Sequence, residues 1–384
     1  MKKILIVAAA VMMAASCEKD PANLGLSTQD KELKAAVEQY VPGVIYKIYG
    51  NLADEAQNLY ADLLAMKTSA SISQTQIDKA CTDFLAARKW WEQSEAFLFG
   101  AATAYGIDPH IDSWPLDQDK LAKSLSNADV IDDLDKEGAG AVDEVGAASL
   151  GFHGIEYILF RDGKNRKSIE RNEIIFAAAV AEDLRNYCSQ LHAAWDPGCP
   201  SARVQLVEDL ELNTVMDSGL TYGENLLQTG NAGSTYRNWP EAVASILVAG
   251  CSNICNEVAN TKIGTAHYVN GDEYNPDYIE SPYSKKSYED FKDNILSIQY
   301  SLYGAQGAEK AGKASIVAFL KSNKWSRADE LTSALSAAVK SLDDAKAKGA
   351  FVDNPTSAEA ENCIVKINAL DALLNEAADW ISKL

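Results

Sequence analysis

The sequence predicts an all-α protein built from antiparallel helical bundles. Apolar residues recur at intervals of three and four over long stretches, which is the spacing of one buried helix face. Two such stripes run through Leu52, Ala56, Leu59, Leu63 and Met66, and through Cys363, Ile367, Leu370, Leu374, Ala377 and Ile381. Alternating runs rich in Val, Ile and Thr, which are typical of strands, are scarce. Amphipathic helices of this kind bury their apolar faces by packing into bundles.

Breaks in the helical pattern divide the chain into individual helices. Residues 31–66 carry the first pattern, and Pro42-Gly43 is expected to split it into two helices. The next predicted helix covers 74–100 and ends at Gly100. Further helices are predicted at 117–124, at 127–136, around His153, and at 172–195, 201–212, 239–261, 286–303, 308–321, 326–347 and 357–383. Ser326 and Ser357 are the predicted N-caps of the last two.

The first 30 residues predict export and a lipid anchor. Lys2 and Lys3 precede an apolar run, residues 4–15, which has the length of a signal-peptide core and not of a membrane span. Small residues before Cys17 resemble a bacterial lipobox, with Ala14 where Leu is usual. We therefore expect a signal peptide at 1–16, lipidation of Cys17 and a polar tether at 17–30. The alternative is an ordinary secretory signal with an incidental cysteine.

The strongest break in the chain is Asp196-Pro197-Gly198-Cys199-Pro200, and it predicts a domain boundary. An N-terminal bundle would cover 31–195 and a C-terminal bundle 196–384. The formal net charge of −20 excludes nucleic acid as a partner, because an acidic surface repels phosphate. After the signal, no segment reaches the roughly 18 uninterrupted apolar residues that a spanning helix needs. We therefore expect the lipid alone to hold the protein at the membrane.

The cysteines are expected to be structural. Cys188 and Cys199 flank a turn and could pair in an oxidising compartment. Cys251 and Cys255 are four apart on a predicted helix, where buried free thiols are the commoner outcome. No Cys/His spacing indicates a zinc site.

The segment Gly151-Phe152-His153-Gly154-Ile155-Glu156 is the strongest candidate for a functional site. On a helix, His153 and Glu156 share one face, as an imidazole and a carboxylate do in metal sites of helical bundles. Gly151 and Gly154 would let another backbone or a ligand come close. Further ligands would have to come from elsewhere, and Glu95, His110 and Asp112 are the nearest in sequence. The alternative is a buried or solvated His–Glu pair without a ligand.

Sharper catalytic motifs are absent from the sequence. It has no His-Glu-x-x-His, and the inverted zinc motif fails because Tyr157 follows Glu156. It also lacks a Gly-x-Ser-x-Gly elbow, a phosphate-binding glycine loop and a dinucleotide fingerprint. With four histidines, a site rich in imidazole is excluded.

Several blocks, taken together, resemble the imelysin-like family. Gly151 to Glu156 resembles the family's Gly-x-His-x-x-Glu signature. The stretch from Trp90 to Gly100 with Glu95, and Ile111-Asp112-Ser113-Trp114-Pro115, look like two further blocks. A weaker similarity is Glu280-Ser281-Pro282-Tyr283-Ser284, followed by Ser287, Asp290 and Asn294. The blocks span roughly residues 35–384.

The resemblance implies an all-α fold of two related helical bundles with a site where they meet. It also implies export, with regulation by iron or a place in iron-uptake systems, and the family's founding label is an insulin-cleaving metallopeptidase. An oxygen-rich ligand set with one imidazole suits iron, manganese or calcium better than catalytic zinc, which normally takes three protein ligands and an open position for water.

Residue by residue, the resemblance implies metal ligands at His153, Glu156, Glu95 and Asp112. Candidates for ligand binding from the second half are Glu280, Ser281 and Ser284. Non-functional alternatives remain open: Asp112 would cap a turn, Glu95 would pair with Arg88, and the two serines would cap a helix. Arg88, Trp114 and Tyr157 are expected to support or pack against the site.

The leading hypothesis is a lipid-anchored protein of the cell envelope, on the periplasmic or surface face of the outer membrane. It would bind a divalent metal, iron or a small polar or metal-bearing ligand between two bundles, with components of iron uptake as partners. The first alternative is a metallopeptidase that uses the same residues. The second is a structural adaptor in which His153 and Glu156 hold the bundles together.

Overall fold

The computed structural model describes residues 25–384 and confirms the all-α prediction. The signal peptide at 1–16 and Cys17 lie outside the described residues. A short antiparallel hairpin, β1 (Phe160–Arg161) and β2 (Lys164–Asn165), interrupts the helices.

The N-terminal helix is continuous where two helices were expected. A π-helical turn, η2 (Val41–Ile45), joins α1 (Thr28–Tyr40) to α2 (Tyr46–Thr68), so the predicted split at Pro42-Gly43 is wrong. The turn makes a close tertiary contact, since a Cβ on Gly43 would lie 2.7 Å from the carbonyl oxygen of Gly304. The helix also begins earlier than Lys31, at a capping box formed by Ser27 and Asp30.

The second long helix is shorter than predicted. It is α3 (Gln74–Glu92), and it ends well before Gly100. The Ser94 hydroxyl donates a 2.6 Å hydrogen bond to the Trp91 carbonyl, and such local bonds compete with the helical ladder. A 3₁₀ turn, η3 (Glu95–Phe97), follows, and Gly100, with φ of +95°, precedes α4 (Ala101–Ala104).

The rest of the N-terminal half consists of short helices and one long one. The predicted helices at 117–124, 127–136 and 172–195 are confirmed within a few residues. The elements are α5 (Asp108–Ile111), α6 (Gln118–Ser126), α7 (Ala128–Glu137), η4 (Gly138–Glu144), η5 (Ala147–Ser149), α8 (Gly151–Leu159), α9 (Arg171–Trp195), α10 (Ser201–Asp209) and α11 (Tyr222–Leu227).

The C-terminal half opens with one long helical stretch that runs beyond the predicted 239–261. It comprises α12 (Trp239–Ser245), η6 (Ile246–Ser252), α13 (Asn253–Asn256), η7 (Glu257–Ile263) and α14 (Gly264–His267), and both η segments are π-helical. This stretch is long and apolar enough to span a membrane by length and composition, which the sequence analysis did not anticipate. Most of it is buried in the protein, as in the core helix of a soluble protein.

The remaining helices are α15 (Ser287–Tyr303), α16 (Ile316–Ser322), η8 (Phe351–Asp353), α17 (Ala328–Lys346) and α18 (Ala358–Ile381). The predicted helix at 308–321 is therefore shorter than expected. Ser357 caps α18 as predicted, because its side chain accepts a hydrogen bond from the Ala360 amide. Ser326 is not an N-cap: Arg327 holds that position, without a side-chain bond.

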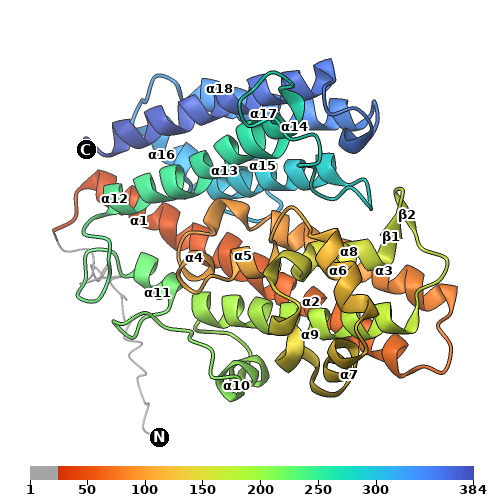
Figure 1. The fold of residues 1–384 in the computed structure, drawn as a ribbon. Coiled ribbons are helices and arrows are strands. Elements are labelled where there is room, and N and C mark those ends of the chain that lie inside the picture. Colours follow the sequence, from red (N-terminus) through yellow and green to blue (C-terminus); the bar gives the residue numbers. More distant parts are fainter. Residues whose placement is uncertain (1–24) are drawn as a thin grey trace, which may run out of the picture.

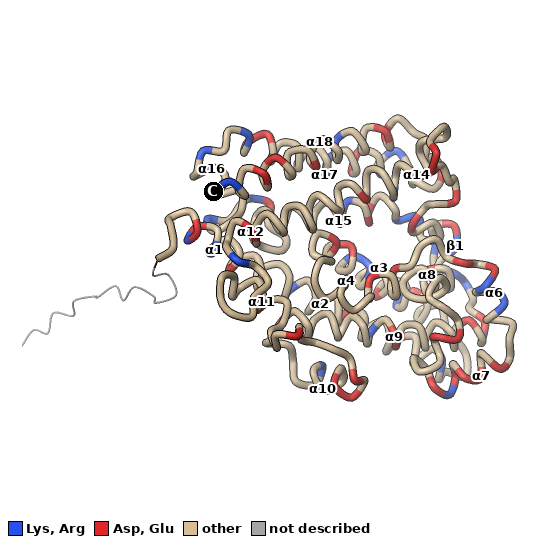
Figure 2. The backbone as a smooth tube through the Cα atoms, turned by 60° about the vertical axis from the view of Figure 1, so that its left-hand side comes forward, with Lys and Arg blue, Asp and Glu red and all other residues tan. Residues whose placement is uncertain are grey.

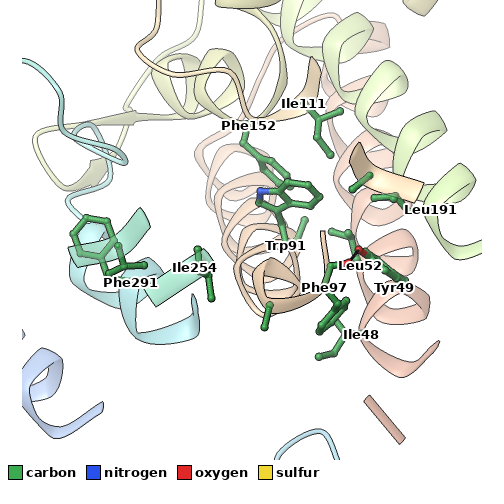
Figure 3. Close-up of a cluster of buried hydrophobic side chains, with 14 of the residues drawn as sticks. Ile48, Tyr49, Leu52, Trp91, Phe97, Ile111, Phe152, Leu191, Ile254 and Phe291 are labelled. Carbon is green, nitrogen blue, oxygen red and sulfur yellow. Dashed lines mark hydrogen bonds between the residues drawn. The ribbon is translucent and has the colours of Figure 1, made fainter. Parts of the chain in front are cut away.

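The helices form two layers that face each other (Figure 1). In one layer α2 packs on α3 and α9; in the other α17 packs on α15 and α18. α1 belongs to the first half of the sequence but packs on α12 and α16. Most buried hydrophobic side chains form one continuous cluster from Leu33 to Ile381, part of which appears in Figure 3. Ala193, Cys199 and Val207 form a small second cluster. The predicted boundary at residue 196 stays a prediction.

All six cysteines in the described part of the chain are buried free thiols, so Cys188 and Cys199 are not paired. Acidic residues are spread over both layers and outnumber basic ones along the chain (Figure 2).

Candidate functional site

A cluster of charged side chains is buried between the layers, with the Arg88 guanidinium at its centre. Arg88 belongs to α3 and is 2% exposed. Its Nη2 lies 2.5 Å from Glu92 Oε1, and its Nη1 bonds the Asp112 carboxylate. Glu280 and Asp290, from the second half of the chain, lie 3.7 Å from Nη2 and 3.6 Å from Nε. One cation therefore brings together four carboxylates from distant parts of the sequence.

The Asp112 carboxylate connects Arg88 to His153. Its Oδ1 lies 3.1 Å from His153 Nε2, and its Oδ2 accepts a 2.7 Å hydrogen bond from the indole N–H of Trp91. The other ring nitrogen of His153, Nδ1, faces Glu156 Oε2 at 4.0 Å. The Trp91 ring stacks on Phe152, the residue before His153, which fixes α3 against α8 (Figure 3).

Two glycines make the contact between Asp112 and His153 possible. Gly151 has φ of +61°, and a Cβ there would lie 1.9 Å from the carbonyl oxygen of Ile111. A Cβ on Gly154 would lie 2.4 Å from the Ser149 carbonyl oxygen. Glycine tolerates both the positive φ and the close approach, so α8 begins directly against the end of α5. The expectation that these glycines admit a neighbouring backbone is confirmed.

Two serines before α15 bind carboxylates of the cluster. The Ser284 amide and hydroxyl donate hydrogen bonds of 2.7 and 2.6 Å to Glu156 Oε1. The Ser281 hydroxyl donates to Asp290, with the Ser281 backbone at φ of +52°. The alternative that these serines cap α15 is wrong, because Lys286 is its N-cap.

Lys262, from η7, is the second buried cation of the cluster and is 2% exposed. Its Nζ lies 3.1 Å from Glu280 Oε2, 3.7 Å from Glu95 Oε1 and 4.0 Å from Glu92 Oε2. Glu95 thus pairs with Lys262, and the alternative that it pairs with Arg88 is wrong. Because α3 ends at Glu92, Glu95 lies on η3 and has left the face that carries Arg88.

Burial raises the pKa of three acids in the cluster, Glu95, Glu280 and Asp290. It raises the pKa of Glu95 well above its usual range, and the nearby Lys262 ammonium offsets this only in part. Burial and the Glu92 carboxylate together raise the pKa of Asp290 in the same way. Burial also raises the pKa of Glu280. These acids therefore hold protons more tightly than free carboxyls do.

The pKa values of Asp112 and His153 are not determined by burial alone. Burial opposes ionisation of Asp112, but the Arg88 charge and the nearby His153 ring hold its pKa below its usual range. Burial disfavours the His153 cation, but the nearby carboxylates of Asp112 and Glu156 raise its pKa to about 9. The imidazole is accordingly protonated at neutral pH in this arrangement.

Several buried polar atoms of the cluster have no hydrogen-bond partner within the described chain. They include Arg88 Nη2, Glu92 Oε1, His153 Nε2, Glu156 Oε2 and Glu280 Oε2. All five lie within 4.0 Å of an opposite charge, but without hydrogen-bond geometry. Since buried polar atoms are nearly always hydrogen-bonded, these are the atoms that a further partner would satisfy.

Three of the acids have the spacing of a metal site. Glu92, Glu95 and Asp112 each offer one oxygen, and these oxygens lie within 4.8 Å of one another. The donor set fits a hard or intermediate cation, because it consists of carboxylate oxygens with one imidazole nearby.

A surface cleft lies on the other side of Trp114 from the cluster. The indole of Trp114 lies 4.5 Å from the His153 ring, centre to centre, and also lines a cleft of about 400 Å³. The cleft walls include Pro115, Ile279, Pro282 and Tyr283, so both halves of the chain contribute. Trp114 thus separates the buried imidazole from the cleft.

The structure brings together all the site residues predicted from the sequence, within the described chain. His153, Glu156, Glu95, Asp112, Glu280, Ser281 and Ser284 all belong to the cluster, and their function stays a prediction. His110 does not belong to it, because its Nε2 pairs with Asp183 Oδ2 at 2.8 Å.

The sequence analysis missed Glu92 and Lys262. Glu92 follows Arg88 by one helical turn, which is the spacing of a helical ion pair. Lys262 is a basic residue near the end of a long apolar helix, and a buried charge there calls for a partner. Both features can be recognised in the sequence. Neither of them identifies the residues from the other half of the chain with which Glu92 and Lys262 pair.

The fold and the cluster define an all-helical protein with a buried, carboxylate-rich site between two helical layers. The peptidase-family model described as Imelysin matches residues 45–377, a range that contains every charged residue of the cluster. The chain therefore belongs to the imelysin family.

The comparisons with individual proteins agree with this assignment. The chain is 24% identical over 289 residues to iron-regulated protein A of Synechococcus elongatus, covering 75% of this chain and 69% of that protein. Its fold is similar to a crystal structure described as an iron-regulated protein A precursor from Parabacteroides distasonis, with a TM-score of 0.75, 22% identity and coverage of 93% and 96% of the two chains. An imelysin-like protein from Psychrobacter arcticum is similar with a TM-score of 0.64, 14% identity and coverage of 94% and 97%.

Proposed function

We propose that this protein binds a divalent cation, iron foremost, in the buried cluster around Arg88, Asp112 and His153. Carboxylates of Glu92, Glu95 and Asp112 would hold the ion, and His153 would contribute a nitrogen donor after losing its proton. A bound ion would supply concentrated positive charge to the site.

The surplus of negative charge in the cluster carries this proposal. Six carboxyl groups face three basic groups there: Glu92, Glu95, Asp112, Glu156, Glu280 and Asp290 against Arg88, His153 and Lys262. With all of them ionised, three negative charges remain uncompensated among buried side chains. Such a surplus is costly without a counter-ion, and burial accordingly raises the pKa of Glu95 and of Asp290.

The preference for iron rests on the donor set and on the relatives. Carboxylate oxygens with one imidazole suit iron, manganese or calcium better than catalytic zinc. Two similar proteins are named for regulation by iron. We further propose that the protein is exported and held in the cell envelope by a lipid on Cys17, with components of iron uptake as partners, which the N-terminal sequence supports.

Cation binding is tested directly by calorimetric titration of the full chain with Fe²⁺ under anaerobic conditions, and with Mn²⁺ and Ca²⁺. We expect binding of at least one of these ions, and at least tenfold weaker binding for Glu95→Gln. The matched control is Asp183→Asn, which removes a buried carboxylate outside the cluster and should leave the affinity unchanged. If none of the three ions binds, the proposal fails.

The family label favours a second candidate, a metallopeptidase with the same residues. Incubation with unfolded protein substrates, with and without a chelator, distinguishes the two. Chelator-sensitive cleavage that Glu95→Gln abolishes would replace the binding function with a catalytic one. The structural adaptor requires that no ion binds and that His153→Ala strongly destabilises the fold.

A further inference from the structure

The Lys262 ammonium occupies the position in the cluster where a bound cation would neutralise the same acids. Its Nζ lies within 4.0 Å of carboxylate oxygens of Glu92, Glu95 and Glu280. Glu92 and Glu95 are also two of the three acids with the spacing of a metal site. A lysine charge and a metal ion would therefore compete for the same two carboxylates.

Lys262 is held less firmly than the other buried cation. Two of its three carboxylate contacts exceed 3.5 Å, so they are charge contacts and not hydrogen bonds. Arg88, in contrast, bonds the Asp112 carboxylate, lies 2.5 Å from Glu92 and has its guanidinium against the Phe152 ring. A lysine ammonium also ends a flexible four-carbon stem, whereas a guanidinium is a rigid fork.

The helix around Lys262 offers its charge a second position. Lys262 lies in the π-helical segment η7, where backbone hydrogen bonds link residues five apart and so bring them about one turn from each other. Glu257 lies five residues earlier and begins that segment. It is partly exposed, so it stands nearer to solvent than the buried acids do. Glu257 is also among the acids whose charges raise the pKa of Lys262, so it is a partner available to the ammonium outside the three buried contacts.

We propose that Lys262 is a built-in counter-ion that a divalent cation displaces from Glu92 and Glu95, with Glu257 as the partner that receives the displaced ammonium. This inference rests on the proposed cation binding. Lys262 would stabilise the metal-free protein and weaken cation binding. The site would take up an ion only when the free energy gained by binding the ion exceeds the free energy lost by separating Lys262 from Glu92 and Glu95.

The test measures Mn²⁺ affinity of the full chain by calorimetry, with wild type compared with Lys262→Met. Methionine keeps the length of the side chain and removes its charge. We expect at least tenfold tighter binding in Lys262→Met. The control is Lys136→Met, which removes an exposed lysine paired with Asp132 and should change the affinity less than twofold. Equal or weaker binding in a folded Lys262→Met would overturn the inference.

A second variant keeps the test decisive if Lys262→Met does not fold. Glu257→Gln lies at the edge of the cluster, and it should weaken Mn²⁺ binding several-fold because the displaced ammonium loses its partner. Unchanged or tighter binding in Glu257→Gln would contradict the displacement. The proposed function fails in a different way. In that case both the wild type and Lys262→Met are folded, but neither binds Mn²⁺, Fe²⁺ or Ca²⁺, so no affinities can be compared.

Discussion

The carboxylate of Asp112 lies 3.1 Å from Nε2 of His153, although the two residues belong to separate short helices. The same carboxylate bonds Arg88 and Trp91, so three side chains meet on one acid. Asp112 therefore supports the charge of His153 and also ties α3 to α8. These contacts of Asp112 predict how the stability of the protein changes when the carboxylate is removed and how that stability depends on pH.

Removal of the Asp112 charge should destabilise the protein strongly. Asp112→Asn leaves Arg88 and His153 in the interior with one carboxylate fewer, and breaking a buried ion pair typically costs about 3–5 kcal/mol. Urea unfolding followed by circular dichroism measures the loss. Asp183→Asn, which breaks the partly exposed pair with His110, should cost less. Equal losses of unfolding free energy in the two variants would mean that the stability of the cluster does not depend on the Asp112 charge.

The charge on His153 should make stability depend on pH. Its pKa of about 9 in the fold exceeds the ordinary 6.5, so the protonated ring is favoured by folding. This contribution, roughly 3 kcal/mol, is complete below about pH 6.5 and is lost as the pH rises through 9. The difference in unfolding free energy between wild type and His153→Gln should therefore shrink over that window. A difference that is constant between pH 6 and pH 9.5 would contradict protonation of His153.

Gly151 should tolerate no side chain. A Cβ there would lie 1.9 Å from the Ile111 carbonyl oxygen and would push α8 away from Asp112. Gly219 is the matched control, because it also has a positive φ but nothing lies within 4 Å of the added carbon. Gly219→Ala should cost only the left-handed backbone penalty of about 1–2 kcal/mol, and Gly151→Ala clearly more. Similar unfolding midpoints for the two variants would argue against a steric role.

Ser284→Ala should destabilise through Glu156. The variant removes a 2.6 Å hydrogen bond from the hydroxyl to a buried carboxylate, a bond worth about 1.5–3 kcal/mol. Ser336→Ala, on an exposed face of α17, removes a hydroxyl that bonds the Thr332 carbonyl and should change stability by less than about 0.5 kcal/mol. Thermal and urea unfolding of both variants provide the comparison. A loss in Ser284→Ala no larger than in Ser336→Ala would show that Glu156 finds another donor.

Much of the helical architecture was predictable because the spacing of apolar residues along a helix is visible in the local sequence. The stripe from Leu52 to Met66 and the stripe from Cys363 to Ile381 are both buried as their spacing indicated. One error concerns a residue pair that is typical of a helix break. Pro42-Gly43 looked like such a break, but η2 carries the helix through it, and Gly43 packs closely against Gly304.

The candidate site was predictable only in part. His153 and Glu156 share a helix, so their common face follows from spacing alone. Glu95 and Asp112 were first considered only as the nearest acids in the sequence, and Glu280 and the two serines entered through the family resemblance. Glu92 and Lys262 were missed, since an ordinary helical ion pair and a single lysine in an apolar helix do not reveal partners about 170 residues away.

By itself the sequence determined the helical fold class, the face shared by His153 and Glu156, and the need for glycine at the start of their helix. Only the tertiary structure decided which acids share Arg88 and Lys262, and that more carboxylates than cations are buried there. The physical reason is that helical periodicity is a property of neighbours in the chain, whereas charge compensation depends on distances between segments that meet only after folding.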